Sequence, residues 1–148
     1  MECKVSWLGS GGMAFSAETG SGHLVNMDGA PEAGGRNLAP RPMELLLAGA
    51  GACSAFDVVL ILQKARQAVS ACDVTLHADR ASDDPKVFTK IDLHFQVKGK
   101  DLDQNKVERA VKLSHEKYCS ASIMMEKTAE LTHSFEIIDD LQETAPAL

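Results

Sequence analysis

Aromatic side chains are scarce in this sequence. Phe, Tyr and Trp make up 5% of its 148 residues, so the core has to be built from aliphatic side chains, Ala and Met. Basic runs are also missing and the net charge is -6, which excludes the positive surface of a typical nucleic-acid-binding protein. The first residues show no charged segment followed by an apolar one, so we expect no secretion signal and a cytoplasmic location.

Paired cysteines are absent as well. The four cysteines stand alone at positions 3, 53, 72 and 119, without any C-x-x-C pair, so no metal site of the usual zinc spacing is expected. In a cytoplasmic protein they should rest as thiols, and a disulfide among them would be a transient step of chemistry. No phosphate-binding or dinucleotide-binding glycine motif is present, and we expect no cofactor.

Strands and helices occur in runs rather than in strict alternation, which predicts an α+β fold. Alternating apolar residues indicate strands, Pro42 suits the first turn of a helix, and Asp103 suits a helix cap. We expect a single domain over residues 1–140. It comprises a β-meander over 1–27, a loop over 28–41, a central helix over 42–69, two strands over 72–98, two helices over 103–129 and a last strand over 131–138; residues 141–148 are expected to be a disordered tail.

The central helix is unusually apolar. Residues 45–62 contain one charge, that of Asp57, and approach the length of a membrane span. A buried helix of a soluble protein explains the composition better, because the rest of the chain is ordinary, so we expect no membrane partner. The small residues over 49–52 favour close helix–helix packing. One sheet per chain covers such a helix poorly, which indicates a dimer whose central helices pack on each other.

The thiols differ in their surroundings. Cys53 stands in the small-residue stretch and on its own reads better as a small buried apolar residue than as a reactive thiol, and an ionised Asp57 one turn later would disfavour its thiolate. Cys119 precedes a helix whose N–H groups can stabilise a thiolate, with His115 one turn before it. Cys3 and Cys72 occupy strand positions that we expect to face inward, in a packing role.

Two segments carry a resemblance to a known family. RPMELLLAGAGACSAFDVVLILQKAR (41–66) and HEKYCSASIMMEK (115–127) resemble the OsmC/Ohr superfamily, and the flanking strand order extends the match through Ile138. Within it the chain is most similar to the YhfA-like branch. The resemblance implies an intertwined homodimer with long central helices between antiparallel or mixed sheets.

The resemblance also implies a chemistry. Cys53 would attack the O–O bond of an organic hydroperoxide and become a sulfenic acid, and Cys119 would condense with it to form a disulfide. An external dithiol, lipoyl-type in some members, would reduce that disulfide without metal or organic cofactor. An apolar cleft lined by Phe56, Met124 and Met125 would receive the peroxide.

The activating residues of the better-studied members are not in place. Those proteins carry an arginine in the N-terminal strands, whereas this chain has none before Arg36. Their glutamate, ten residues before the reactive cysteine, corresponds to Met43, and Glu44 lies one position along. The helical rise from Glu44 to Cys53 is about 13 Å, so Glu44 reaches the thiol only through a helix break at 49–51 or from the other subunit. Arg36 and Arg41 read better as solvated loop charges than as a replacement cation.

Three functions are therefore compatible with the sequence. The first is a thiol-dependent peroxidase for organic hydroperoxides. The second is a binding protein that holds a small apolar ligand in the same cleft without chemistry. The third is a redox sensor whose disulfide changes its shape for a partner protein.

Overall fold

The computed structural model describes residues 1–140 and divides the chain into two compact units, Met1–Ala48 and the part from Gly49 onward. The expected single domain stays a prediction, and the expected disordered tail lies outside the described residues. The chain combines two sheets with helices, which confirms the α+β class.

The first unit is built on an antiparallel meander. β1 (Cys3–Trp7), β2 (Ala14–Thr19) and β3 (Leu24–Asp28) pair in chain order, as the alternation over residues 1–27 predicts. The turns use glycines in the left-handed region, with φ of 104° at Gly9 and 82° at Gly22. Every residue of β1 is exposed, so the inward position expected for Cys3 is wrong: this strand has no covering layer within its unit.

Asp28 organises the loop that follows the meander. Its carboxylate accepts hydrogen bonds from the backbone N–H groups of Gly29 (2.8 Å), Arg36 (2.9 Å) and Leu38 (3.1 Å), and the residue is 1% exposed. These bonds, led by that of Leu38, hold the pKa of the Asp28 carboxyl below its usual value. A short 3-10 helix, η1 (Pro31–Ala33), lies within the loop. A single carboxylate thus fixes a segment that has no periodic pattern of its own.

Helix α1 (Pro42–Lys64) begins at the expected proline and continues through Gly49 and Gly51 without a break. It ends five residues earlier than the expected Val69, because Arg66 adopts a left-handed φ of 58° and a strand begins at Ala68. Gly51 serves a helix–sheet contact, since a Cβ there would lie 2.6 Å from Cδ1 of Leu76, whereas Gly49 and Ala52 are exposed. By length and composition α1 is able to cross a membrane, although a core helix of a soluble protein passes the same test.

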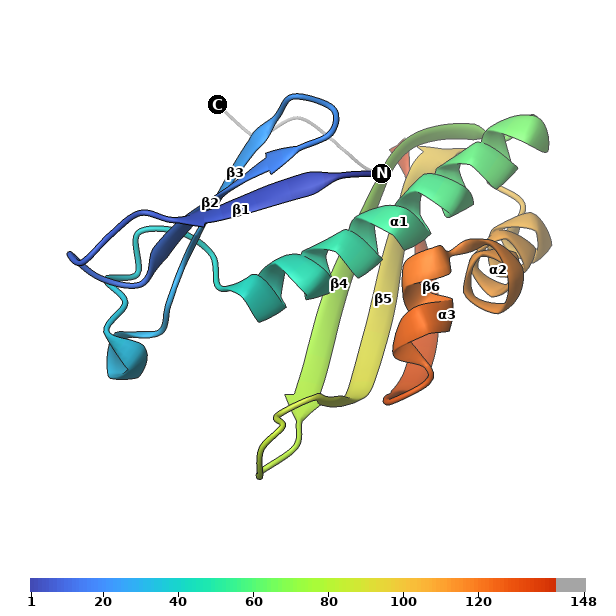
Figure 1. The fold of residues 1–148 in the computed structure, drawn as a ribbon. Coiled ribbons are helices and arrows are strands. Elements are labelled where there is room, and N and C mark those ends of the chain that lie inside the picture. The colour runs from blue at the N-terminus through green and yellow to red at the C-terminus, as the bar shows by residue number, and fades with distance from the viewer. Residues whose placement is uncertain (141–148) are drawn as a thin grey trace, which may run out of the picture. The chain divides into compact units, whose positions relative to one another are not determined.

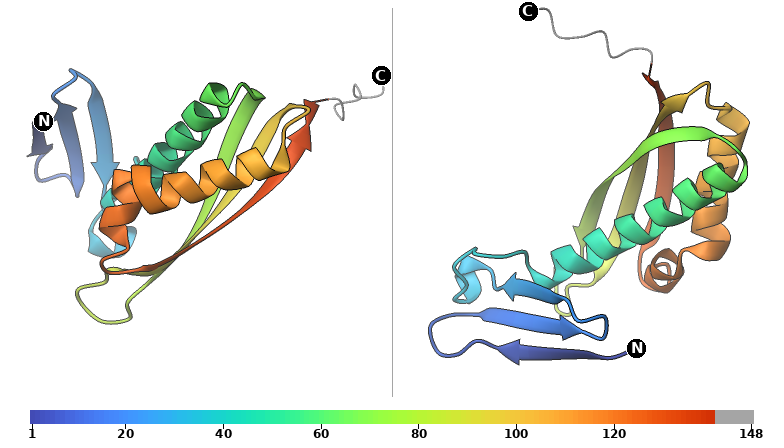
Figure 2. Two further views of the ribbon diagram at one scale, coloured as in Figure 1. Left: turned by 90° about the vertical axis from the view of Figure 1, so that its right-hand side faces the viewer. Right: turned by 90° about the horizontal axis from the view of Figure 1, so that it is seen from above.

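The second unit packs helices on one face of a mixed sheet (Figures 1 and 2). β4 (Ala68–Arg80) pairs antiparallel with β5 (Phe88–Lys100), and β5 pairs parallel with β6 (Glu130–Asp139). The helices are α1, α2 (Gln104–Leu113) and α3 (Ser120–Met125), with the side chain of Asp103 capping α2 as predicted. The core lies between the two layers and is aliphatic with few aromatics; it includes Val58, Leu62, Ile91, Phe95, Val97, Val107 and Val111.

We expect the Asp28 carboxylate to be required for an ordered loop. Because its pKa is lowered in the folded protein, its stabilising effect is present above the usual carboxyl pKa and is lost as the pH falls through the lowered value. Asp28→Asn should therefore lower the protection factors against hydrogen exchange of the Arg36 and Leu38 amides, and acidification through the lowered pKa should do the same. Glu32→Gln, an exposed acid in the same loop, is the matched control; equal exchange in both variants contradicts the assignment.

Candidate active site

Two cysteines from distant parts of the chain meet in the second unit. Cys53 lies in the middle of α1 and Cys119 directly precedes α3. Their sulfurs and a carboxylate oxygen of Asp57 all lie within 4.8 Å of one another. The cysteines are free thiols, and since an S–S bond is about 2.05 Å long, the two sulfurs need to approach by less than about 3 Å to form one.

A wide helical turn delivers Cys119 to this position. After α2, the π-helical segment η2 (Ser114–Tyr118) closes with a hydrogen bond of 2.8 Å from the Cys119 N–H to the Ser114 carbonyl. Such turns are frequent at functional sites. Cys119 then takes extended geometry and caps α3, with its sulfur accepting from the Ser122 N–H at 3.5 Å.

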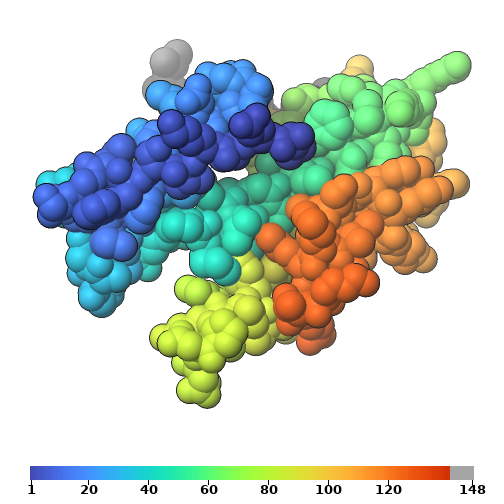
Figure 3. All heavy atoms as spheres, in the orientation of Figure 1, coloured from blue at the N-terminus to red at the C-terminus, as the bar shows by residue number. Residues whose placement is uncertain are grey.

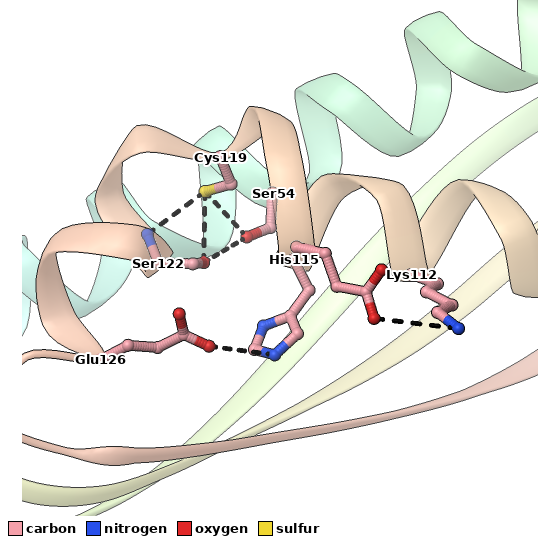
Figure 4. A network of polar contacts seen from close by, with 7 residues as sticks. Ser54, Lys112, His115, Cys119, Ser122 and Glu126 are labelled. Carbon is pink, nitrogen blue, oxygen red and sulfur yellow. Dashed lines mark hydrogen bonds and ion pairs between the residues drawn. The ribbon is translucent and has the colours of Figure 1, made fainter.

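Two serine hydroxyls complete the surroundings of the Cys119 sulfur (Figure 4). Ser54 Oγ donates to it at 3.1 Å from α1, and Ser122 Oγ donates at 3.2 Å from α3. A third hydroxyl, that of Ser114, donates to the Ser54 carbonyl at 3.2 Å. All four residues are buried, so the sulfur accepts its hydrogen bonds away from water.

These contacts give the two thiols opposite acidities. Burial alone would raise the pKa of Cys119, but the hydrogen bonds from Ser122 and Ser54 outweigh it and the pKa is lowered. The pKa of Cys53 is raised, first by burial and then by the neighbouring Cys119 and Asp57, although the Ala121 backbone N–H opposes the rise. The stabilised thiolate is therefore the fully buried Cys119, while the partly exposed Cys53 keeps its proton more strongly.

Asp57 is the third member of the group. Burial raises the pKa of its carboxyl, against the effect of a hydrogen bond with Ser114. Its Oδ2 atom is buried and has no hydrogen-bond partner among residues 1–140. Asp57 therefore differs from an ordinary surface acid: it holds its proton to higher pH and has an acceptor site left over.

His115 does not serve Cys119 as its position in the sequence suggests. Its Nε2 lies 3.0 Å from the carboxylate of Glu126 (Figure 4). Its ring lies 4.7 Å from that of His133. Burial lowers the pKa of His133. The Cys119 thiolate is thus stabilised by neutral hydroxyl and amide donors, while His115 contacts Glu126 and His133.

The expected cleft residues lie at the surface. Phe56 is 67% exposed and Met124 is 68% exposed, whereas Met125 is partly buried. Atoms of α1 and α3 reach the surface in Figure 3. A cleft that uses Phe56 and Met124 therefore needs a second wall from outside the second unit.

Glu44 and the loop arginines have local roles. Glu44 lies in the first turn of α1, where its carboxylate accepts the Arg41 N–H at 2.9 Å and so caps the helix. The backbone N–H of Arg36 contributes to the Asp28 loop. Because α1 has no break at Gly49–Gly51, the route by which Glu44 would reach the thiol of its own chain through a broken helix is absent.

Sequence reasoning missed the serines. Ser54 follows Cys53 directly and Ser122 comes three residues after Cys119, the spacing at which a capping residue meets the helix N–H groups. The capping position was a readable signal for Ser122, whereas Ser54 is 65 residues from Cys119 and its contact depends on the tertiary fold.

Among the described residues, one group of possible metal ligands has its donor atoms close enough together to share an ion. This group consists of Cys53, Asp57 and Cys119.

Comparisons with known proteins agree on one family. The model of a family described as OsmC-like protein matches residues 34–134. Protein YhfA of Escherichia coli strain K12 is 49% identical over 138 residues, which cover 93% of this chain and 98% of YhfA. A hypothetical protein from Aquifex aeolicus VF5 has a similar structure, with 32% identity, a TM-score of 0.80 and coverage of 94% of this chain and 96% of that one.

A more distant structure shares the fold. It is an organic hydroperoxide resistance protein, OsmC, from Legionella pneumophila, with a TM-score of 0.68, 21% identity and coverage of 92% of this chain and 97% of that one.

We expect Ser122→Ala to raise the pKa of Cys119, because one of its hydroxyl donors is lost. The fraction of thiolate at neutral pH should then fall. The measurement is the ultraviolet absorbance of the thiolate against pH in protein carrying Cys3→Ser, Cys53→Ser and Cys72→Ser, so that the signal belongs to Cys119. Ser120→Ala, an exposed serine of the same helix, is the control; an equal shift in both variants, or in neither, contradicts the assignment.

Proposed function

Because the chain belongs to the OsmC-like protein family, we propose that it is a two-cysteine redox protein that reduces organic hydroperoxides. The observation that carries the proposal is the approach of the Cys53 and Cys119 sulfurs within 4.8 Å, with hydrogen-bond donors on the buried one. The hydroperoxide-resistance protein of the same fold supports the substrate class.

The two thiols differ in exposure, and their proposed roles follow from this difference. Cys53 is partly exposed, so a peroxide reaches its sulfur, whereas Cys119 is fully buried. Cys53 attacks one oxygen of the O–O bond and becomes a sulfenic acid, and the other oxygen leaves with a proton as the alcohol. The Cys119 thiolate then attacks the Cys53 sulfur, and the hydroxyl group leaves as water after taking a proton.

Asp57 is the proton donor that fits the second step. Burial raises the pKa of its carboxyl, and a carboxylate oxygen lies within 4.8 Å of both sulfurs. A proton held there is available to the departing hydroxide at a higher pH than on an ordinary aspartate. Asp57 thus donates a proton to the departing hydroxide, while the serine hydroxyls stabilise the attacking Cys119 thiolate.

The same arrangement suits reduction by an external dithiol. A thiolate of the dithiol attacks the more accessible sulfur, that of Cys53, and the S–S bond breaks with Cys119 as the leaving group. A thiol of lower pKa leaves faster, and the donors from Ser54 and Ser122 receive the charge. The second thiol of the dithiol then displaces Cys53, which regains its proton. Lipoyl-type dithiols fit this role, and no organic cofactor is required.

We also propose that the protein acts as a cytoplasmic homodimer. In the single chain only 28% of the most apolar window of α1 is buried, although its mean hydropathy is 2.2. Exposed apolar side chains of α1 and α3, among them Leu46, Phe56 and Met124, are what a second subunit would cover. A partner would also supply the missing wall beside Phe56 and Met124.

One observation favours a second function. The pKa of Cys53 is raised, which lowers the amount of nucleophilic thiolate at neutral pH. A protein that holds a small apolar ligand against Phe56 and Met124 would need no such thiolate. Ligand affinity that is unchanged by Cys53→Ala, together with no reaction with hydroperoxide, would support this function over the redox one.

We expect cumene hydroperoxide to consume two thiols in reduced protein carrying Cys3→Ser and Cys72→Ser, and peptide mass spectrometry to find a Cys53–Cys119 disulfide. Adding Cys119→Ser should stop the reaction at a sulfenic acid on Cys53, and adding Cys53→Ser should abolish it. The rate should increase with pH, because the raised pKa of Cys53 leaves most of it protonated near neutrality.

Two results separate the alternatives. Unreacted thiols in the protein that retains Cys53 and Cys119 would refute the redox function. Oxidation without turnover in the presence of a lipoyl-type dithiol would indicate a redox sensor instead of a peroxidase.

We expect Phe56→Glu to convert a dimer to a monomer, because a charge would be placed in the covered apolar surface. Light scattering after size exclusion should then show the molar mass falling by half. Val87→Glu changes another exposed apolar residue, in the β4–β5 connection, and should leave the mass unchanged. A wild-type monomer, or a Phe56→Glu dimer, contradicts the proposed assembly.

A further inference from the structure

Three acidic groups crowd together at the redox centre. The sulfurs of Cys53 and Cys119 and a carboxylate oxygen of Asp57 lie within 4.8 Å of one another. Fully ionised, the three groups would repel one another strongly. Protons on two of them relieve this repulsion, and one divalent cation would relieve it as well.

We propose that, in the reduced protein, Cys53, Asp57 and Cys119 form a binding site for a thiophilic divalent cation such as Zn²⁺. The donor set has the composition that zinc prefers, two thiolates and a carboxylate. Three protein ligands leave one position of a tetrahedron for water or another small ligand. The site uses the same side chains as the proposed redox function but does not depend on it.

The spacing of the donor atoms fits this coordination. With Zn–S bonds of about 2.3 Å, the two sulfurs of a tetrahedral site lie about 3.8 Å apart. The present separations of up to 4.8 Å therefore need to contract by no more than about 1 Å. Cys53 and Asp57 are one turn apart on α1, so their side chains share a face of the helix, and Cys119 approaches from the start of α3.

Asp57 shows independently that a ligand position is open. Its Oδ2 is buried and has no hydrogen-bond partner among the described residues. Buried carboxylate oxygens are normally satisfied, so Asp57, which has one oxygen within 4.8 Å of both sulfurs, retains an unused acceptor. Coordination to a cation would satisfy it without moving the helix.

The serines would hold the third ligand in place. Ser54 Oγ and the N–H and Oγ of Ser122 donate to the Cys119 sulfur, and a bound ion would share that sulfur with these donors. Hydrogen bonds of this kind orient metal ligands and tune their basicity. A bound ion would keep the two sulfurs apart, so metal binding and disulfide formation would exclude each other.

The test uses reduced protein carrying Cys3→Ser and Cys72→Ser, so that only the two site cysteines remain. Titration with Co²⁺ should give one ion per chain, with a thiolate-to-cobalt charge-transfer band that Zn²⁺ abolishes by displacement. Adding Cys53→Ser or Cys119→Ser should remove or strongly weaken the band. Adding Asp57→Asn, which keeps the shape of the side chain, should weaken Zn²⁺ affinity at least about tenfold.

Asp73→Asn is the matched control, since Asp73 is an exposed acid on β4 and lies outside the group. Circular dichroism checks that each variant is folded. No charge-transfer band, or equal Zn²⁺ affinity in the Asp57→Asn and Asp73→Asn proteins, would overturn the proposal.

The outcome is distinguishable from failure of the redox function. One equivalent of Zn²⁺ should slow formation of the Cys53–Cys119 disulfide by hydroperoxide several-fold, and a chelator should restore the rate. A protein that forms the disulfide but binds neither Co²⁺ nor Zn²⁺ lacks the metal site and keeps the redox function. A protein that binds the ion but does not react with peroxide, with or without metal, has the metal site and lacks the redox function.

Discussion

The sulfur of Cys119 is held between two helices that are distant in sequence. Ser54 reaches it from α1 and Ser122 reaches it from α3, at 3.1 and 3.2 Å. Because all three residues are buried, each donor compensates for water that the sulfur has lost. The contact fixes how α3 approaches α1, and it is possible only because the π turn over 114–118 brings Cys119 out of the line of α2. The position of Cys53 relative to its partner follows from this contact.

Because of this contact, the thiol that ionises more easily is not the thiol that is more exposed. A thiolate is favoured at the sulfur that solvent does not reach, and the more accessible sulfur retains a proton. An arginine beside Cys53 would do the opposite, since an opposite charge nearby favours the ionised form of the more accessible thiol. The absence of arginine before position 36 and the presence of serines around Cys119 therefore belong together. For the proposed redox function, this arrangement would favour rapid resolution and release of the disulfide over a fast first attack.

Much of the fold, and the two segments that carry the reactive thiols, could be predicted from the sequence. Alternation gave the strands of both sheets, Pro42 marked the start of α1, and the two segments around Cys53 and Cys119 indicated the family. The end of α1 could not be predicted, because no local sequence pattern indicates that Arg66 adopts a left-handed φ.

The surroundings of the thiols were predicted less well than the thiols themselves. His115 has the right spacing to assist Cys119, yet Glu126 lies 3.0 Å from its ring nitrogen, and that competing partner comes from a helix whose packing no local pattern reveals. The role of Ser54 likewise depends on a contact across 65 residues. Local patterns predict which residues carry reactive atoms, whereas the electrostatics around them are set by tertiary contacts.

Burial of α1 and the chemistry of its cysteine are physically coupled. Phe56 lies three residues after Cys53 on α1, and Cys53 lies within 4.8 Å of Asp57, so whatever covers the exposed Phe56 also changes how much water reaches these two groups. Removing that water raises the pKa of both groups further, because both carry negative charge when ionised. A second subunit would therefore strengthen the preference for a protonated Asp57 and Cys53 beside a Cys119 thiolate. In that arrangement the apolar surface of α1 is part of the redox centre, since it sets which of three neighbouring acids carries the charge.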